Sequence, residues 1–127
     1  MTLAKQLGIW IDHSRAHVTE LAADPMETRT IESDFTHQDR EHTLARSEHV
    51  MHNKEHHQQL EYYKKLGAII VNYDDVILFG PTDAKSELLN ILRADHRFAK
   101  IKIEAEQKDK MTYVQQHAFV KEYFSTH

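Results

Sequence analysis

The sequence feature that most restricts the possible folds is a short run, residues 76–79, in which every side chain is apolar. Such a run, with turn residues on both sides, is typical of a strand buried on both faces of a parallel sheet. Pro81 suits the first turn of a following helix, where its missing N–H is not needed. Apolar residues at helical spacing then predict a helix that ends near Ala94. A buried strand followed by a helix indicates a layered α/β domain.

The residues before this unit predict antiparallel strands and a long helix. Residues 7–11 and 17–21 are predicted to form a β-hairpin around a polar turn. Residues 27–32 predict a third, edge-like strand. Apolar side chains at three- and four-residue steps predict an amphipathic helix over residues 54–72, with Asn53 as its cap.

The C-terminal part predicts one more strand, over residues 99–105, and a closing helix over residues 111–124. The inner face of the closing helix is expected to carry Tyr113, Val114, His117, Ala118, Val120 and Phe124. The order is an N-terminal hairpin followed by αβαβα. We predict a single domain over residues 1–127, a three-layer α/β fold on a mixed sheet of the ribonuclease-H-like kind.

Composition narrows the function classes. The chain has 127 residues with 16 basic and 20 acidic side chains, a formal net charge of -4. This excludes a strongly basic nucleic-acid-binding domain and leaves a local basic patch as the route to such binding. The absence of cysteine excludes disulfides, thiolate catalysis and cysteine-ligated zinc. Neither a signal-peptide core nor an apolar run of membrane-spanning length occurs, so we expect a cytoplasmic protein.

Three segments resemble the central domain of archaeal and eukaryotic class-1 release factors and Pelota proteins. Residues 8–18, Gly-Ile-Trp-Ile-Asp-His-Ser-Arg-Ala-His-Val, resemble its opening strands. Residues 76–85, Val-Ile-Leu-Phe-Gly-Pro-Thr-Asp-Ala-Lys, resemble its strand, Gly-Pro turn and lysine-bearing helix. The helical segment with Arg46, His49, His52, His56 and Tyr62-Tyr63-Lys64-Lys65 resembles the long helix after that domain's catalytic loop. The chain looks like a stand-alone bacterial relative of this domain.

One departure separates the chain from that family. Release activity in the family rests on a Gly-Gly-Gln tripeptide before the long helix. The corresponding residues 34–41 contain Gln38 but no glycine, so they lack the backbone freedom that two glycines supply. The resemblance therefore implies the fold and an association with the ribosome, tRNA or other RNA. It argues against peptidyl-tRNA hydrolysis by that route, so we expect a non-catalytic domain without a cofactor.

Basic and aromatic side chains mark the candidate nucleic-acid contacts. On the long helix, Tyr63 is expected to face the core, while Tyr62, Lys64 and Lys65 reach the surface and could stack on or neutralise RNA. Lys85, at the start of the next helix, could bind one phosphate together with the helix N-terminus. The other candidates are Arg93 and Arg97, near the end of that helix.

Histidine is unusually frequent, with 11 residues, and most of them lie between positions 37 and 57. Residues 34–53 are predicted to be a polar, histidine-rich loop that leads into the long helix. His49, His52 and His56 fall on one side of that helix, and imidazoles at this spacing can share a metal ion. The alternative is an interface in a homo-oligomer, where protonation near pH 6 would charge several neighbouring histidines.

Two further patterns bear on chemistry. Asp12 ends the first strand, where ribonuclease-H-like nucleases hold a metal, and Glu20, Asp74 and Asp75 could complete a two-metal hydrolase site. Aspartate is equally favoured at such a position by turn chemistry alone. The residues 80–86 lack the second glycine of a nucleotide-binding P-loop, so no nucleotide site is predicted. His117 is expected to be a core histidine that hydrogen-bonds to a strand.

Overall fold

The structure, a computed structural model, describes residues 5–21, 28–32 and 48–126. The elements are β1 (Gln6–Ile11), β2 (Arg15–Glu20), β3 (Thr28–Glu32), α2 (Glu48–Ile70), β4 (Asp75–Gly80), α3 (Ala84–Arg93), the 3-10 helix η1 (His96–Phe98), β5 (Lys102–Gln107) and α4 (Tyr113–Thr126). The strands form one sheet in the order β3-β2-β1-β4-β5. β1 and β3 each pair antiparallel with β2, whereas β4 pairs parallel with both β1 and β5. The predicted mixed-sheet α/β architecture is confirmed.

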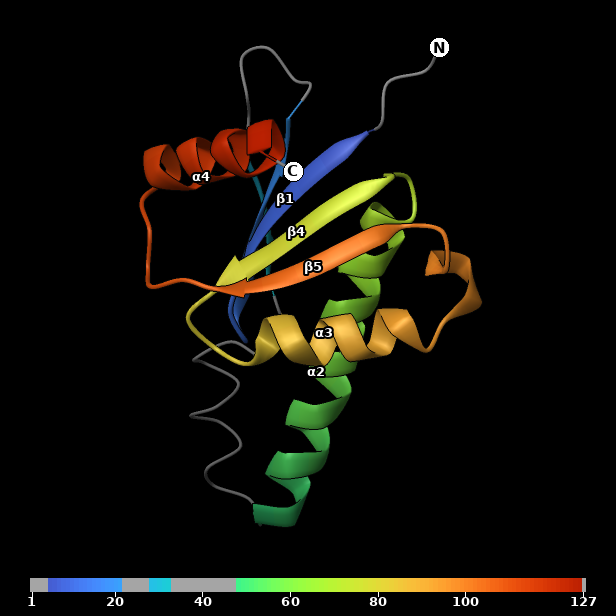
Figure 1. The fold of residues 1–127 in the computed structure, drawn as a ribbon. Coiled ribbons are helices and arrows are strands. Elements are labelled where there is room, and N and C mark those ends of the chain that lie inside the picture. Colours follow the sequence, from blue (N-terminus) through green and yellow to red (C-terminus); the bar gives the residue numbers. More distant parts are fainter. Residues whose placement is uncertain (1–4, 22–27, 33–47, 127) are drawn as a thin grey trace.

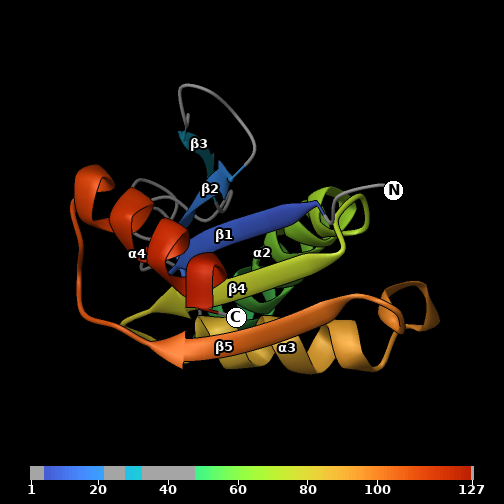
Figure 2. The ribbon, with the colours of Figure 1, turned by 45° about the horizontal axis from the view of Figure 1, so that its top comes forward.

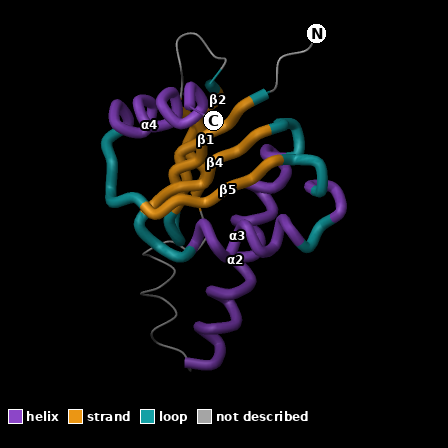
Figure 3. Tube along the Cα trace, viewed as in Figure 1, coloured by secondary structure: helices purple, strands orange, loops and turns teal. Residues whose placement is uncertain are grey.

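Helices cover both faces of the sheet and make three layers. Figures 1 and 3 show α2 and α3 on one face and α4 on the other, alongside β1. Successive residues of a strand point to opposite faces. Leu7, Ile9 and Ile11 of β1 therefore pack in the core under α2 and α3, while Trp10 packs with residues of α4.

β4 is buried on both faces, as its apolar run predicts. Val76 and Leu78 belong to the core on the α2 and α3 side, and Ile77 and Phe79 belong to the cluster with α4. All four side chains are at most 1% exposed. Figure 2, which looks onto the face that carries α4, shows this helix in front of the sheet and α2 and α3 behind it.

Several predicted boundaries differ from the structure for identifiable reasons. The long helix begins at Glu48, not at 54, so Asn53 lies inside it and does not cap it. Residues 81–83 form a turn, and the next helix starts at Ala84 with Asp83 at its cap position. Phe98 is buried in η1, and this extra turn of helix delays β5 to Lys102.

The predicted inner face of the closing helix is wrong at Tyr113, Val114 and Ala118, which are all exposed. Tyr113 and Val114 are 52% and 78% exposed, because the first turn of α4 lies away from the core. The buried positions of α4 are Gln116, Val120, Tyr123 and Phe124. Gln116 can be buried there because both polar atoms of its side-chain amide have hydrogen-bond partners. Its Nε2 donates to the Met111 carbonyl oxygen, and its Oε1 lies 3.2 Å from His17 Nδ1.

None of the described helices is both long and apolar enough to cross a bilayer.

The absence of a side chain at Gly8 sets how closely α4 approaches the sheet. A Cβ atom at Gly8 would overlap Cγ2 of Val120 and lie 3.0 Å from its Cγ1. We expect Gly8→Ala to lower the free energy of unfolding by about 1–3 kcal/mol, as overpacking of a dense core does. The measurement is urea denaturation followed by circular dichroism.

Val120→Ala provides the matched test of this packing. Removing both Val120 methyl groups takes away the two closest contacts of a Gly8 side chain and leaves only Val120 Cβ, at 3.2 Å. The double variant should therefore lose less stability than the sum of the two single variants. Strictly additive losses would contradict the proposed clash.

Candidate functional site

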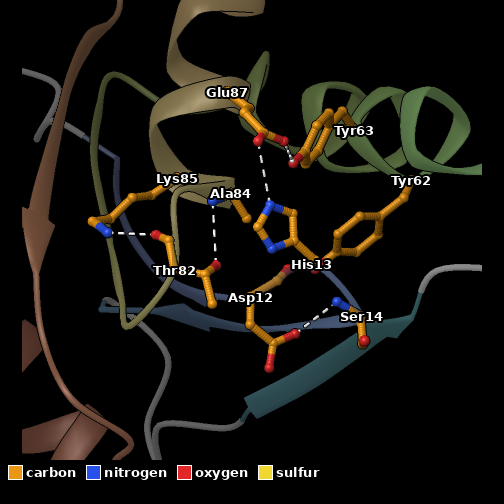
Figure 4. Close-up of polar contacts among 9 residues, drawn as sticks. All are labelled: Asp12, His13, Ser14, Tyr62, Tyr63, Thr82, Ala84, Lys85 and Glu87. Carbon is orange, nitrogen blue, oxygen red and sulfur yellow. Dashed lines mark hydrogen bonds and ion pairs between the residues drawn. The ribbon is translucent and has the colours of Figure 1, made fainter. Parts of the chain in front are cut away.

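The carboxyl ends of β1 and β4 lie side by side, because these strands are parallel neighbours. After β1 the chain turns towards β2 on one side, and after β4 it enters α3, which leads to β5 on the other side. This kind of divergence is where α/β sheets most often bind ligands. Figure 4 shows the polar side chains that gather there from the β1–β2 turn, α2 and the start of α3.

Asp12 serves the turn between β1 and β2. Its Oδ1 atom accepts hydrogen bonds from the backbone N–H groups of Ser14 and Arg15, each at 2.8 Å. The backbone N–H of Asp12 also donates to the Arg15 carbonyl oxygen at 2.9 Å. A carboxylate that bonds the backbone two and three residues ahead stabilises a turn. The turn interpretation of Asp12 is therefore confirmed.

The carboxylates expected to join Asp12 in a nuclease site lie elsewhere. Glu20 is opposite Leu7 and Asp75 is opposite Gln6, at the start of β1. Asp12 follows the end of this strand, roughly 20 Å away at about 3.3 Å per residue. Within the described ranges, no group of three or more His, Asp or Glu side chains is placed to hold a metal. The two-metal interpretation of these four carboxylates is therefore wrong.

A chain of hydrogen bonds ties the hairpin tip to both helices behind the sheet. The Tyr63 hydroxyl donates to Glu87 Oε1 at 2.6 Å, and Glu87 Oε2 lies 3.3 Å from His13 Nε2. The neighbouring Tyr62 hydroxyl donates to the Asp12 carbonyl oxygen at 3.0 Å. Burial raises the pKa of both tyrosines, so they stay neutral donors.

Tyr62 is therefore not at the surface, and its expected outward direction is wrong. Its side chain is fully buried between α2 and the sheet, as is that of Tyr63. Both side chains belong to the core cluster under α2 and α3, and each hydroxyl has its own partner: Tyr62 donates to the Asp12 carbonyl oxygen and Tyr63 to Glu87. Tyr62 cannot stack on an RNA base in this arrangement.

Lys85 is also buried, with its ammonium group turned inward. Its Nζ donates to the Thr82 carbonyl oxygen at 2.5 Å and to Gln107 Oε1 at 2.7 Å. Gln107 Nε2 in turn donates to the Pro81 carbonyl oxygen. The Ala84 N–H is occupied as well, because it donates to Thr82 Oγ1. Lys85 thus fastens the β4–α3 turn to the end of β5, and the expected phosphate site at this helix start is not formed.

The remaining predicted contacts are at the surface, and two of them border one groove. Lys64 and Arg97 are 77% and 73% exposed and line the same groove, of about 410 Å³, between α2 and the α3–η1 segment. Arg93 is exposed and lines the adjoining hollow, which shares Leu92 and Phe98 with this groove. Lys65 is exposed on α2.

His49, His52 and His56 lie on α2, but their side chains are outside the described part of the structure. The same holds for residues 33–47, which include most of the predicted histidine-rich loop. The metal and interface interpretations of this segment therefore stay predictions.

Two other histidines join the α4 side of the sheet. His17 stacks on Trp10 with 5.0 Å between ring centroids and meets Tyr113 at 4.8 Å. Burial lowers the pKa of His17. His117 is half-buried, and its Nε2 lies 2.5 Å from Thr28 Oγ1 of β3. The predicted hydrogen bond between His117 and a strand is confirmed.

Sequence reasoning missed two features of this region. The contact between His13 and Glu87 joins residues 74 positions apart, and neither has a local pattern that indicates its partner. The groove depends on how α2 crosses the α3–η1 segment. Its one sequence signal is the pair of small residues Gly67 and Ala68 on an otherwise bulky helix face.

The strand order and the helices on both faces define the class of fold, a three-layer α/β domain on a mixed five-stranded sheet. Neither a family profile nor a curated protein sequence matches the chain. Solved structures do match, at sequence identities that show the fold alone.

The chain is similar to the Pelota protein of Archaeoglobus fulgidus, with a TM-score of 0.60 and 13% identity over 95% of this chain. The Thermoplasma acidophilum Pelota protein matches with a TM-score of 0.55 and 12% identity over 98% of the chain. An archaeal translation termination factor matches with a TM-score of 0.50 and 17% identity over 97%. The matches cover 32%, 33% and 40% of those proteins, so the chain spans about a third of their length. The resemblance noted in the sequence is thus matched by the fold.

The lowered pKa of His17 makes a prediction about stability. A histidine that binds its proton less tightly in the folded protein stabilises the fold above the unfolded-state pKa of about 6.5. This stability is lost as the pH falls through 6.5 towards the lower folded-state value. We expect His17→Phe, which keeps a ring between Trp10 and Tyr113, to lose less stability between pH 7.5 and pH 5.5 than the unaltered protein. Urea denaturation at both pH values measures this, and equal losses would show that His17 does not carry the effect.

Proposed function

We propose that this protein is a non-catalytic, release-factor-like domain that associates with the ribosome, tRNA or other RNA. The observation that carries the proposal is the fold match over at least 95% of the chain to two Pelota proteins and a translation termination factor. The proposal concerns binding alone and takes over no activity of those longer proteins.

The charge distribution supports binding through one face. The chain carries a net charge of -4, yet Lys64, Lys65, Arg93 and Arg97 are all exposed on α2, α3 and η1, on the side of the sheet opposite α4. We call these four side chains the basic surface. Phosphate contacts by such side chains provide most of the affinity for RNA without needing a sequence-specific site. Tyr62 and Lys85 are left out of the basic surface because both are buried.

The glycine content supports binding without hydrolysis. The chain contains Gly8, Gly67 and Gly80 and no others, so a Gly-Gly-Gln tripeptide occurs nowhere in it. The corresponding residues 34–41 lie outside the described part of the structure. The other two interpretations, a homo-oligomer with a histidine-rich interface and a metal-dependent hydrolase, have no support from the described residues and are not proposed.

We expect the protein to co-sediment with ribosomes or to bind tRNA at low salt, with an affinity that falls steeply as salt is added. Lys64→Ala/Arg93→Ala should weaken this binding. It should also reduce the slope of log K against log salt by about 0.7–0.9 for each phosphate that the variant no longer neutralises. Sedimentation assays and fluorescence anisotropy from 50 to 300 mM salt measure both effects.

Lys110→Ala/Lys121→Ala is the matched control, because it removes the same charge from exposed positions on the loop before α4 and on α4 itself. This control should bind like the unaltered protein. The proposal fails if no binding is found at low salt, and the basic surface is excluded if both double variants weaken binding equally.

A further inference from the structure

The groove between α2 and the α3–η1 segment has the features of a protein-binding site. Its walls are mostly apolar: Leu60, Gly67 and Ala68 come from α2, and Ile91 and Phe98 from the opposite wall. Leu60 and Ile91 are each about two-fifths exposed, and they are two of the five large hydrophobic side chains exposed among the described residues. A third, Val71, directly follows the last residue of α2 and lies outside the lining of the groove. Exposed apolar side chains that gather at one hollow mark an interaction site more often than scattered ones do.

The small residues Gly67 and Ala68 shape this groove. A Cβ atom at Gly67 would lie 3.5 Å from Phe98 Cζ and 3.6 Å from Leu92 Cδ2, so the missing side chain leaves space between the two walls. From Leu60 to Ala68 the groove follows α2 for about 12 Å, at about 1.5 Å per residue. Apolar side chains two turns apart on a partner helix, at positions i and i+7, span about 10.5 Å, and this is a spacing used in helix-in-groove recognition.

Each wall also carries one exposed cation. Lys64 extends from α2, and its pair with Glu61 is long, at 3.7 Å, and exposed, so the ammonium group can exchange partners at little cost. Arg97 extends from η1, where Asp95 holds its Nε and Nη2 atoms and leaves Nη1 outside this pair. The carboxylate of Asp95 also accepts from the Arg97 backbone N–H, which fixes the arginine at the edge of the groove. The lining of the groove thus carries two exposed cations and one carboxylate, Asp95, which is already paired with Arg97. With its apolar walls, this arrangement is complementary to an apolar stripe bordered by carboxylates.

We propose that this groove binds an amphipathic protein helix whose apolar stripe is flanked by acidic residues. RNA fits the groove less well, because the aromatic rings that line it, Tyr63 and Phe98, are buried and offer no face for base stacking. A second copy of the chain fits less well too. A few partly exposed side chains are far from the roughly 800 Å² per partner that a stable dimer buries.

Binding of a helix in this groove goes beyond the proposed association with RNA. Experiments can refute either proposal without refuting the other. Ala68→Gln and Ile91→Gln change the walls of the groove but keep all four side chains of the basic surface. Both positions are exposed, so a glutamine is tolerated there without burying its amide. Val114→Gln is the matched control, since Val114 is an exposed apolar residue of α4, on the opposite face of the sheet.

The probe is a fluorescent 16-residue synthetic helix with leucines at positions i, i+4 and i+7 and glutamates on both sides of this stripe. A twin peptide carries lysine in place of every glutamate. We expect the acidic peptide to bind the full chain, Ala68→Gln/Ile91→Gln to weaken it by about tenfold or more, and Val114→Gln to leave it unchanged. We also expect the lysine twin to bind poorly to the unaltered chain and better to Lys64→Glu.

Three results would overturn the proposal: no binding of the acidic peptide, equal binding of both peptides, or the same loss in the control and the groove variant. Displacement of the peptide by a twelve-nucleotide uridine RNA, together with weaker binding of that RNA by Ala68→Gln/Ile91→Gln, would assign the groove to RNA instead. Ribosome co-sedimentation of the groove variant tests the proposed function separately, because the basic surface is intact in it.

Discussion

The burial of β1 on both faces is the constraint on which the rest of the structure depends. β1 pairs antiparallel with β2 and parallel with β4, so it joins the hairpin half of the sheet to the βαβ half. Its side chains alternate between the core under α2 and α3 and the cluster under α4. α4 can lie this close only because Gly8 has no side chain opposite Val120. The end of β1 is equally tight, since a Cβ at Gly80 would overlap the Ile11 carbonyl oxygen.

This close packing at the carboxyl ends of β1 and β4 explains why the sheet edge carries structural contacts. Asp12 closes the hairpin turn, Lys85 fastens the β4–α3 turn to β5, and Tyr63 and Glu87 connect the helices to His13. Each of these groups could serve chemistry elsewhere, but here its hydrogen-bonding capacity is largely used within the fold. A buried polar side chain whose hydrogen bonds are made within the fold gains less from a ligand, because a ligand would have to compete with those bonds. On the exposed face of α2, α3 and η1, Lys64 has only a long ion pair with Glu61, and Arg97 Nη1 lies outside the pair with Asp95. This face is therefore better suited than the strand ends to bind a partner.

Local patterns predicted the architecture well because strands and helices differ in the period of their apolar residues. The run from Val76 to Phe79 and the alternation in β2 required no knowledge of distant contacts. The predictions were wrong where contacts between distant parts of the chain determine whether a side chain is buried. Tyr62 is buried because its hydroxyl reaches a turn 50 residues away, and Lys85 because Gln107 of another strand accepts a hydrogen bond from it. Val114 was expected inside since it is apolar, but the start of α4 lies away from the core. The groove was missed for the same reason, as it forms only when α2 crosses the α3–η1 segment.

The glycines show how a chain can keep this fold without the loop chemistry of release factors. Gly8 and Gly80 are required where backbone or helix comes too close for a side chain, and Gly67, on α2, faces Phe98 in the groove. No glycine is left for a loop that needs unusual backbone freedom, since the chain has three. The glycines that the packing demands are present, and those that hydrolysis by Gly-Gly-Gln demands are not. The proposed binding must then depend on surfaces that the fold holds in place, and on the face formed by α2, α3 and η1 exposed basic and apolar side chains line a groove.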